Sequence, residues 1–332
     1  MVTPRRRAAG FSLMELMIAV ALMGVVVIYL VQTFTTQHRT YVMVDQVTEA
    51  QQNLRAISDL VEREIRAAGF MVDEAGAVCG VDATNGPDTL FVSDGAALDP
   101  SAAIQPSLGA RLAVGSSPGA GTVTLSLGLG DTTVLDGQPA YDTNGDGAND
   151  SDFRVGAGAI VYDRNNPSRG AACGTVAAIP STTSLRVTFL ASTLGGVSAG
   201  QQLVVVPAHV YQVNNNAQLL RDGLVLAEDV EDLQVAYFFD QDGDLTVDPG
   251  ENPGSAGTPY AAFAWDNSNL REIRVNFVVR TRGTDPTFTS GAFQTTENRA
   301  APAATAQDPQ TRRRVHTTTV RVRNVGNRGL LG

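Results

Sequence analysis

The sequence contains no lysine, so all 24 of its basic residues are arginines. It has two cysteines, which permit at most one internal disulfide, and three histidines in 332 residues. The histidines, at positions 38, 209 and 316, are far apart in the chain and show no metal-binding spacing. The absence of lysine reflects composition, and the sparse histidines give no indication of a catalytic metal centre.

Proline is absent between Phe11 and Phe70. Residues 11–31, the first third of this stretch, are apolar and contain a single charged residue, Glu15. A helix of roughly 20 apolar residues spans the ~30 Å hydrocarbon core of a bilayer. Three arginines at positions 5–7 favour a cytoplasmic N-terminus, with the rest of the chain across the membrane. A secretory signal peptide is the alternative, but no small-residue A-x-A site closes the apolar run.

The carboxylate of Glu15 is costly inside a membrane, because insertion scales assign up to about 2.5 to 3.5 kcal/mol to such a charge. We therefore expect it to have a partner. Cleavage between Gly10 and Phe11 would create an α-amino group four residues from Glu15, and equally near the Glu15 of a packed neighbour. An ion pair between subunits would offset the burial of both charges. In the alternative interpretation, Glu15 is protonated in lipid or lies near the headgroups.

A polar helical pattern follows the apolar run, from about Gln32 to Gly69. Five apolar residues within it recur at spacings of three and four, which places them on one helical face: Leu54, Ile57, Val61, Ile65 and Ala68. We expect that face to dock on a globular head. Gly69 is the expected cap at the end of the helix.

After Gly69 the sequence is rich in Gly, Ser, Thr, Asp and Val, and short alternating stretches replace the helical period. Strands are predicted at 122–127, 159–162, 184–190, 202–206, 210–213, 218–221, 271–282 and 315–325. The predicted fold class is α+β, with a long membrane-spanning helix packed on a large β-rich head. We expect a leader at 1–10, a helix over 11–70 whose membrane-spanning part is 11–31, and the head over 71–332. Residues 84–152 are a candidate insertion in the head.

Cys79 and Cys173 lie in a part of the chain that is predicted to be exported, where disulfides persist. We expect them to form one bridge. Closing a loop of roughly 100 residues is worth up to about 4.7 kcal/mol in the chain-entropy model. The alternative is two unpaired buried thiols, because the sequence does not fix the distance between them.

Two acidic loops match calcium-binding loops, in which about six to eight oxygen atoms surround the ion. The first has Phe153 in place of the terminal glutamate; its candidate ligands are Asp142, Asn144, Asp146, Asp150 and Asp152. The second has Leu245 where the pattern has glycine; its candidate ligands are Asp240, Asp242, Asp244, Thr246, Asp248 and Glu251. Bound Ca²⁺ could rigidify a subunit interface. Solvated turns are the alternative, because Asp, Asn and Gly dominate turns.

Catalysis and nucleic-acid binding are not expected. Residues 115–119 match G-x-S-x-G, but that motif needs a strand, a sharp turn and then a helix, and here a strand is predicted to follow. The net charge is −10, and it becomes −13 when the three leader arginines are removed, which disfavours nonspecific DNA binding. The arginines at 312–314 are a local basic cluster that we expect in a solvated loop.

The N-terminal segment resembles the class III leader and first helix of type IV pilins and pseudopilins. The matching residues are Gly10, Phe11, Ser12, Leu13, Glu15 and Leu16. The resemblance implies cleavage after Gly10 by a prepilin peptidase, N-methylation of Phe11, and pairing of Glu15 with the N-terminus of an adjacent subunit. It also implies storage in the inner membrane with a periplasmic head, then a place in a pilus at the cell surface. The proline-free helix departs from major pilins, which commonly carry a proline where the helix bends.

Three further stretches resemble PilW-type minor pilins: 59–70 (DLVEREIRAAGF), 230–240 (VEDLQVAYFFD) and 319–324 (TVRVRN). This implies a non-catalytic minor pilin that primes or supports pilus assembly as a low-abundance, tip-proximal subunit without an organic cofactor. Implied partners are other minor pilins, the major pilin, a tip adhesin-like protein, the prepilin peptidase and the inner-membrane assembly platform. The alternatives are a minor pseudopilin of a type II secretion system and a membrane-anchored, calcium-dependent binding protein.

Overall fold

The computed structural model describes residues 12–70, 72–83, 85–93, 110–129, 141–142, 145–148, 151–191, 194, 203–240, 242–248, 267–285, 288–289, 293–301, 310–323 and 325. The chain divides into two compact units, Met1–Glu49 and Ala50–Gly332. The boundary falls inside one long helix, α1 (Leu13–Ala67), so the last turns of α1 belong to the head unit. The head was expected to begin at residue 71, and in the structure the last turns of α1 also contribute to its core.

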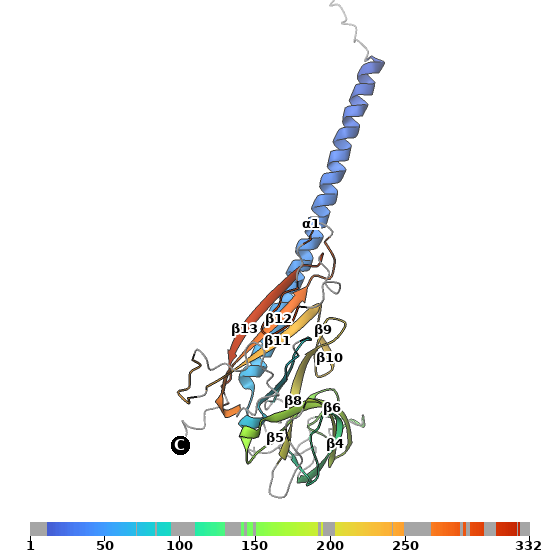
Figure 1. Ribbon diagram of the computed structural model, residues 1–332. Coiled ribbons are helices and arrows are strands. Elements are labelled where there is room, and N and C mark those ends of the chain that lie inside the picture. The colour runs from blue at the N-terminus through green and yellow to red at the C-terminus, as the bar shows by residue number, and fades with distance from the viewer. Residues whose placement is uncertain are drawn as a thin grey trace, which may run out of the picture. The chain divides into compact units, whose positions relative to one another are not determined.

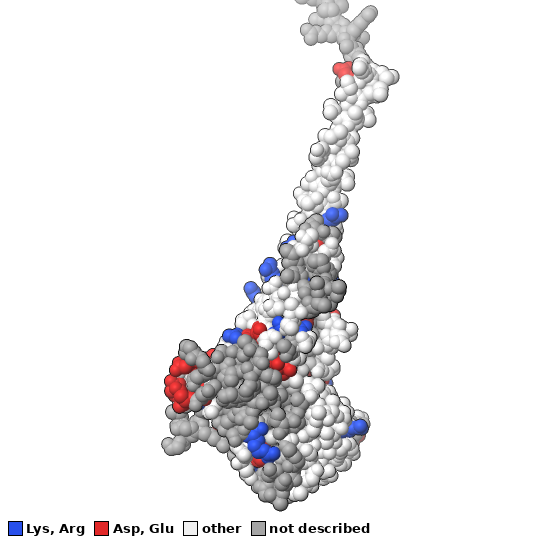
Figure 2. All heavy atoms as spheres, in the orientation of Figure 1, with Lys and Arg blue, Asp and Glu red and all other residues white. Residues whose placement is uncertain are grey.

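In the first unit, the N-terminal part of α1 is apolar on nearly all sides up to Val31. Its residues from Leu13 to Val31 are exposed, and the helix is long and apolar enough to cross a membrane, with a mean hydropathy of 2.5 over an 18-residue stretch. Figure 2 shows this stretch white, with acidic atoms at its upper end. The lack of proline leaves the helical hydrogen bonds uninterrupted. Phe11, the predicted first residue of the helix, lies outside the described residues.

In the second unit, α1 carries the face that the sequence predicts to be buried. All five predicted residues are buried: Leu54, Ile57, Val61, Ile65 and Ala68. The helix ends at Ala67, two residues before Gly69. Gly69 has a φ of 77°, which favours glycine, and its N–H donates to the carbonyl of Ser93 at 2.9 Å. The docking face and the glycine cap are both confirmed.

A sheet of three antiparallel strands lies along this part of α1 (Figure 1). Its order is β11 (Val230–Phe239), β12 (Leu270–Arg280) and β13 (Arg313–Arg321). The predicted alternation of β12 is confirmed, because its residues at 273, 275, 277 and 279 are all buried. These side chains join those of α1 in one hydrophobic core. The helix of the head unit is thus held by apolar packing against β12 and its neighbours.

The remaining strands form a second, larger antiparallel sheet with the order β1-β2-β8-β3-β4-β7-β6-β5, to which β9 and β10 are joined beside β8. Their bounds are β1 (Val78–Val81), β2 (Thr89–Val92), β3 (Ala110–Leu112), β4 (Gly121–Leu129), β5 (Gly158–Asp163), β6 (Ala171–Ser181), β7 (Ser184–Ala191), β8 (Leu203–Val213), β9 (Gln218–Arg221) and β10 (Leu224–Glu228). Short 3₁₀ turns occupy Glu74–Gly76, Pro167–Arg169 and Asn267–Asn269. Because β5 also pairs with β8, the strands β8, β3, β4, β7, β6 and β5 close into a ring.

The ring has a hydrophobic core of its own, with Leu125, Val161, Leu185 and Val205 among its members. Apart from β8, its strands lie between β2 and β8 in the chain, so it is an insertion into the sheet that packs on α1. This corrects the predicted insertion at 84–152. The observed one begins later, because β2 belongs to the sheet near the helix, and it extends beyond residue 152 to β5, β6 and β7.

Strand β8 belongs to both parts of the large sheet, although the sequence predicts two strands at 202–206 and 210–213. On one side its partner changes from β3, opposite Val204 and Val205, to β2, opposite residues 209–211. Pro207 lies between these two pairings. Its missing N–H therefore removes no ladder hydrogen bond on that side, and the strand continues through the proline.

Candidate functional site

The first turn of α1 carries a reciprocal hydrogen-bond pair between Ser12 and Glu15. The N–H of Glu15 donates to Oγ of Ser12 at 3.2 Å, and the N–H of Ser12 donates to Oε2 of Glu15 at 3.3 Å. This is a capping box, which satisfies two backbone donors that a helix N-terminus leaves without partners. This capping box was not predicted, although S-x-x-E before an apolar run is its usual sequence signal.

Glu15 therefore has a local role in the isolated chain besides the predicted one in assembly. Its carboxylate is exposed at the N-terminal end of an apolar helix, where the helix dipole favours a negative charge. The two predicted processing residues, Gly10 and Phe11, lie outside the described residues. Chemically, the segment presents an apolar surface for packing and one carboxylate able to accept a cationic partner.

Within the head unit, a buried polar cluster fixes α1 to the large sheet. Glu64 of α1 accepts hydrogen bonds from the Tyr211 hydroxyl of β8 and from Arg221 of β9, whose Nη2 lies 2.6 Å from Oε1. We call Glu64, Tyr211 and Arg221 the helix anchor. Burial, followed by the charge of Glu64, raises the pKa of Tyr211, so the tyrosine is a hydrogen-bond donor at ordinary pH. Packing of the helix removes the Glu64 carboxylate from water, and its bonds to Tyr211 and Arg221 compensate for the lost hydration.

A buried histidine adjoins the helix anchor. Nδ1 of His209 lies 2.7 Å from Oδ2 of Asp222, and Oδ1 of Asp222 accepts the N–H of Val210 at 3.0 Å. Burial alone would lower the pKa of His209, but the hydrogen bond and charge of Asp222 outweigh it, so the pKa is raised above 6.5. A second histidine, His316 of β13, contacts α1 through Oγ of Ser58 at 3.0 Å. Both therefore have structural partners in the head.

The second acidic loop, between β11 and β12, brings three predicted ligands together. One side-chain oxygen from each of Asp240, Asp242 and Asp244 lies within 4.8 Å of the others. Oδ1 of the buried Asp240 accepts the N–H of Gly243 at 2.6 Å, and Oδ2 accepts the N–H of Leu245 at 3.0 Å. Leu245 has a φ of 70°, so it adopts the left-handed turn for which the pattern has glycine. The missing glycine does not prevent the turn.

Asp240 also has a cationic partner. Arg271 of β12 donates to its Oδ2 from Nε at 3.0 Å and from Nη2 at 2.8 Å. Burial opposes ionisation of Asp240, but the bonds from Arg271 and two backbone amides outweigh it and hold the pKa of Asp240 below 3.8. A cation bound in this loop would have the carboxylates of Asp240, Asp242 and Asp244 as ligands. Asp240 would at the same time remain paired with Arg271, whereas Asp242 and Asp244 are exposed.

The other predicted ligands of this loop are less favourable. The Thr246 hydroxyl donates to Oδ1 of Asp244 at 2.7 Å, and the carbonyl of Leu245 accepts a hydrogen bond from Arg321 at 3.2 Å. Asp248 lies outside the group of three carboxylates found in the described part of the chain. Glu251 lies outside the described residues. The donor set that fits a cation is therefore narrower than the sequence predicts.

The first acidic loop repeats part of this geometry. Oδ1 of Asp142 accepts the N–H of Gly145 at 2.6 Å, and its Oδ2 accepts the N–H of Gly147 at 2.8 Å. Asp146 accepts a backbone N–H two residues on, as Asp244 does in the second loop. Over the described residues, however, Asp142, Asp146 and the buried Asp152 do not form a three-carboxylate group. The other two predicted ligands, Asn144 and Asp150, lie outside the described residues.

The predicted disulfide is confirmed. Cys79 of β1 and Cys173 of β6 are bonded, with 6.1 Å between their Cα atoms, and both are buried. Strand β1 lies in the part of the sheet near α1, whereas β6 belongs to the ring. The bond therefore ties the inserted ring to the part of the head that holds the helix.

The G-x-S-x-G match lacks the structure that a catalytic serine of this motif needs. Residues 115–119 precede strand β4 rather than a helix, as predicted. Ser116 in the match is bonded to the backbone of Ser126: its Oγ accepts the N–H at 3.1 Å. The motif therefore forms a turn before a strand.

Comparison with known proteins places these features in a family. The prokaryotic N-terminal methylation motif matches residues 5–31, which include Gly10, Phe11 and Glu15. The family of type IV pilus-assembly protein W matches residues 197–324, a range that contains β8 to β13. No curated protein matches the chain.

Among solved structures, a type IV-like pilin from Thermus thermophilus is similar at 12% sequence identity, with a TM-score of 0.25, over 83% of this chain and 96% of that one. The chain has one long apolar N-terminal helix and a large β-rich head, and its apolar helix and leader motif indicate a membrane-anchored pilin. The methylation motif and the PilW match over the later strands together identify this chain as a type IV pilin-like protein with a class III leader, of the PilW type.

Proposed function

We propose that this protein is a minor pilin: a non-catalytic, low-abundance subunit that primes or supports assembly of a type IV pilus, close to its tip. The observation that carries the proposal is the exposed apolar stretch of α1 with Glu15 in its first turn, within the matched methylation motif. Such a surface is stable in a membrane or against other apolar helices, and it is unfavourable in water. The segment is therefore suited to a subunit that moves from a bilayer into a fibre.

In this proposal, a prepilin peptidase cleaves after Gly10 and Phe11 is N-methylated. The head is periplasmic while the subunit is stored in the inner membrane, and it reaches the cell surface with the pilus. During assembly, Glu15 exchanges its bond to the Ser12 amide for the cationic N-terminus of a neighbour. That charged partner offsets the cost of burying Glu15 among apolar helices. The partners are the other minor pilins, the major pilin, a tip adhesin-like protein and the inner-membrane assembly platform.

The test separates the assembly role of Glu15 from its capping role. Glu15→Ala removes both, whereas Ser12→Ala removes the cap at a cost of about 1 kcal/mol and keeps the carboxylate. We expect both variants to be processed, Ser12→Ala to enter sheared pili, and Glu15→Ala to remain in membranes. Entry of Glu15→Ala at the wild-type level would contradict the proposal. Equal loss in both variants would assign the effect to the cap.

We further propose that the second acidic loop binds Ca²⁺, with Asp242, Asp244 and Oδ1 of Asp240 as ligands. Three carboxylates with oxygens within 4.8 Å of one another favour this loop over the first. Calcium would then rigidify the end of the three-stranded sheet.

Two alternative functions follow from the same features. If the chain served to bind a ligand with the help of calcium, and not to assemble a pilus, it would be a membrane-anchored, calcium-dependent binding protein. A minor pseudopilin of a type II secretion system is the other alternative.

The calcium proposal is tested by titrating the detergent-solubilised protein with Ca²⁺ and following its thermal midpoint, since a ligand that binds the folded state stabilises it. We expect a saturable rise for wild type, none for the Asp242→Asn/Asp244→Asn double variant, and a normal rise for Asp59→Asn, an exposed carboxylate on α1. A flat wild-type titration, or an equal rise in the double variant, would refute calcium binding at this loop.

A further inference from the structure

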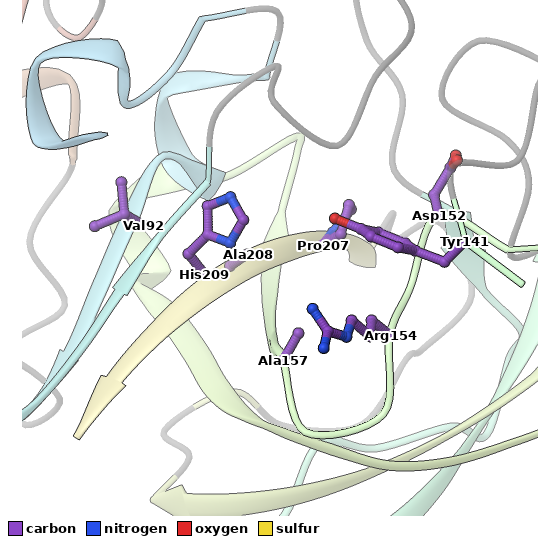
Figure 3. Close-up of a pocket in the computed structure, with 8 residues that line it drawn as sticks. All are labelled: Val92, Tyr141, Asp152, Arg154, Ala157, Pro207, Ala208 and His209. Atoms are coloured by element: carbon purple, nitrogen blue, oxygen red, sulfur yellow. The ribbon is translucent and has the colours of Figure 1, made fainter. Parts of the chain in front are cut away.

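A pocket lies where strand β8 leaves the ring and joins the part of the sheet near α1 (Figure 3). We call it the junction pocket. Its walls include Tyr141, Asp152 and Arg154, from the segment that leads into β5, and Pro207, Ala208 and His209 of β8. It is a small hollow that is partly open to solvent. A ligand held there would be only partly enclosed.

Two of the lining residues offer hydrogen-bond donors that the described part of the chain does not use. The guanidinium of Arg154 has no ion pair or hydrogen bond with another described residue, and neither does the Tyr141 hydroxyl. In Figure 3 both groups are directed toward the side of the pocket where His209 lies, whereas the carboxylate of Asp152 points away. Two donors from the segment that leads into β5 therefore face the same space.

The surroundings of the junction pocket keep the Tyr141 hydroxyl protonated, and an arginine guanidinium is always protonated in proteins, so both groups remain hydrogen-bond donors. Burial and then the charge of Asp222 raise the pKa of Tyr141, so its hydroxyl keeps its proton. His209 holds Asp222 through Nδ1 at 2.7 Å, and Arg221 lies 3.7 Å from the same carboxylate. The negative charge behind the pocket thus has cationic partners of its own. The Arg154 guanidinium carries a positive charge directed toward the pocket.

We propose that the junction pocket binds a small oxyanion, a carboxylate or a phosphate-type group, with Arg154 and Tyr141 as its donors. A guanidinium presents a planar pair of N–H groups that fits two oxygens of such an anion, and a phenol adds a third donor. The anion is either a free ion or the carboxylate of an acidic side chain from another subunit. Binding would hold the segment of Tyr141 and Arg154 against β8, where the ring meets the rest of the head.

The full-length protein in detergent is titrated calorimetrically with acetate, with inorganic phosphate, and with a short peptide that carries one glutamate. Three variants are compared: Arg154→Gln, Tyr141→Phe and Arg186→Gln. Arg186 is the matched control, because it is an exposed arginine of β7 outside the pocket. Neither pocket substitution removes a described ion pair or hydrogen bond, so all variants are expected to fold.

We expect saturable binding of at least one of the two free anions to wild type and to Arg186→Gln, a loss of at least tenfold in Arg154→Gln, and a smaller loss in Tyr141→Phe. Peptide binding at least tenfold tighter than acetate would identify a subunit side chain as the natural ligand, and binding of the free ions alone would identify a free anion. Absence of saturable binding to wild type, or equal affinity of Arg154→Gln and Arg186→Gln, would overturn the proposal.

Discussion

Glu64 of helix α1 and Arg221 of strand β9 form an ion pair across the interface between helix and sheet, with Nη2 2.6 Å from Oε1. The side chain of Glu64 is 8% exposed and that of Arg221 is 30% exposed, so one charge is buried and the other partly solvated. Without Arg221, the buried Glu64 keeps the Tyr211 hydroxyl but loses its cationic partner, and without Glu64, Arg221 keeps the longer 3.7 Å contact with Asp222. The pair therefore positions the last turns of the helix on the head.

Glu64→Ala should destabilise the head. Removing one partner of a fully buried pair costs about 3 to 5 kcal/mol, and the partial exposure of Arg221 reduces the expected loss to about 1 to 3 kcal/mol. Urea unfolding of the detergent-solubilised chain measures it. Glu62→Ala is the control, because Glu62 is partly solvated and pairs with the exposed Arg66 one turn further along the same helix. Its loss should stay below about 0.5 kcal/mol. Equal losses would contradict the role assigned to Glu64.

Cys79→Ser/Cys173→Ser should lower the free energy of unfolding by about 2 to 4 kcal/mol, because the bond restricts the unfolded chain. Since the bond ties the ring to β1, proteolysis of the double variant should also begin within residues 110–191, ahead of α1. Denaturation and limited proteolysis with peptide mass analysis check both effects. A midpoint unchanged from wild type would show that the bond adds nothing to stability.

The head should lose stability as the pH rises from mildly acidic to mildly alkaline. Burial raises the pKa of Asp88 to about 7 and that of Asp232 to about 6, from 3.8. The folded chain therefore binds more protons than the unfolded chain in this interval, and stability falls with pH. His209 acts in the same direction: its contribution is present below 6.5 and is lost as pH rises through its raised pKa. Asp240 acts oppositely, but only below 3.8.

Urea midpoints at about pH 5 and about pH 8 measure this dependence. Asp88→Asn should make it shallower, whereas Asp59→Asn, an exposed control, should leave it unchanged. Asp88 accepts the backbone N–H groups of Ala83 and Val235 at 2.8 Å each, so the variant is also expected to be less stable at acidic pH. A midpoint that rises between the two pH values in wild type would contradict the assignment.

Gly80→Ala should destabilise the contact between β1 and β11. A Cβ at Gly80 would lie 1.9 Å from the hydroxyl oxygen of Tyr237 and 2.7 Å from its ring carbon Cζ, so the buried tyrosine would have to move. Such overpacking costs about 1 to 3 kcal/mol. Gly119→Ala is the control, because its Cβ would meet Val123 at an ordinary 3.9 Å. Equal thermal midpoints for the two variants would contradict the packing described here.

Local patterns in the sequence predicted the elements that local physics determines. The buried face of α1 followed from its spacing, the cap from Gly69, and the inward face of β12 from alternation. Strand β6 escaped prediction because its sequence, AACGTVAAIPS, is rich in small residues with little strand preference. Pro207 led to the prediction of two strands where the structure has one, β8. The strand continues through the proline because its neighbour changes from β3 to β2 at that point. At these two positions tertiary pairing overrides local preference, whereas β11, VEDLQVAYFF, has a strong local strand preference and was nevertheless not predicted as a strand.

The candidate sites divide in the same way. Glu15 and the two cysteines were recognisable from residue type and position, and the Ser12 cap was visible in the sequence although it was missed. The helix anchor and the junction pocket were not predictable. Each depends on side chains more than 50 residues apart that meet once β8 is paired on both sides, such as Glu64 with Arg221, 157 residues apart. No periodicity or motif reports such contacts.

The most direct test of the account is the mass of the N-terminal peptide from sheared surface filaments and from membranes of the same cells. The account predicts a peptide that begins with N-methylated Phe11 in both fractions, since a minor pilin is processed in the membrane and then incorporated. An intact leader, with residues 1–10 still attached in both fractions, would contradict it.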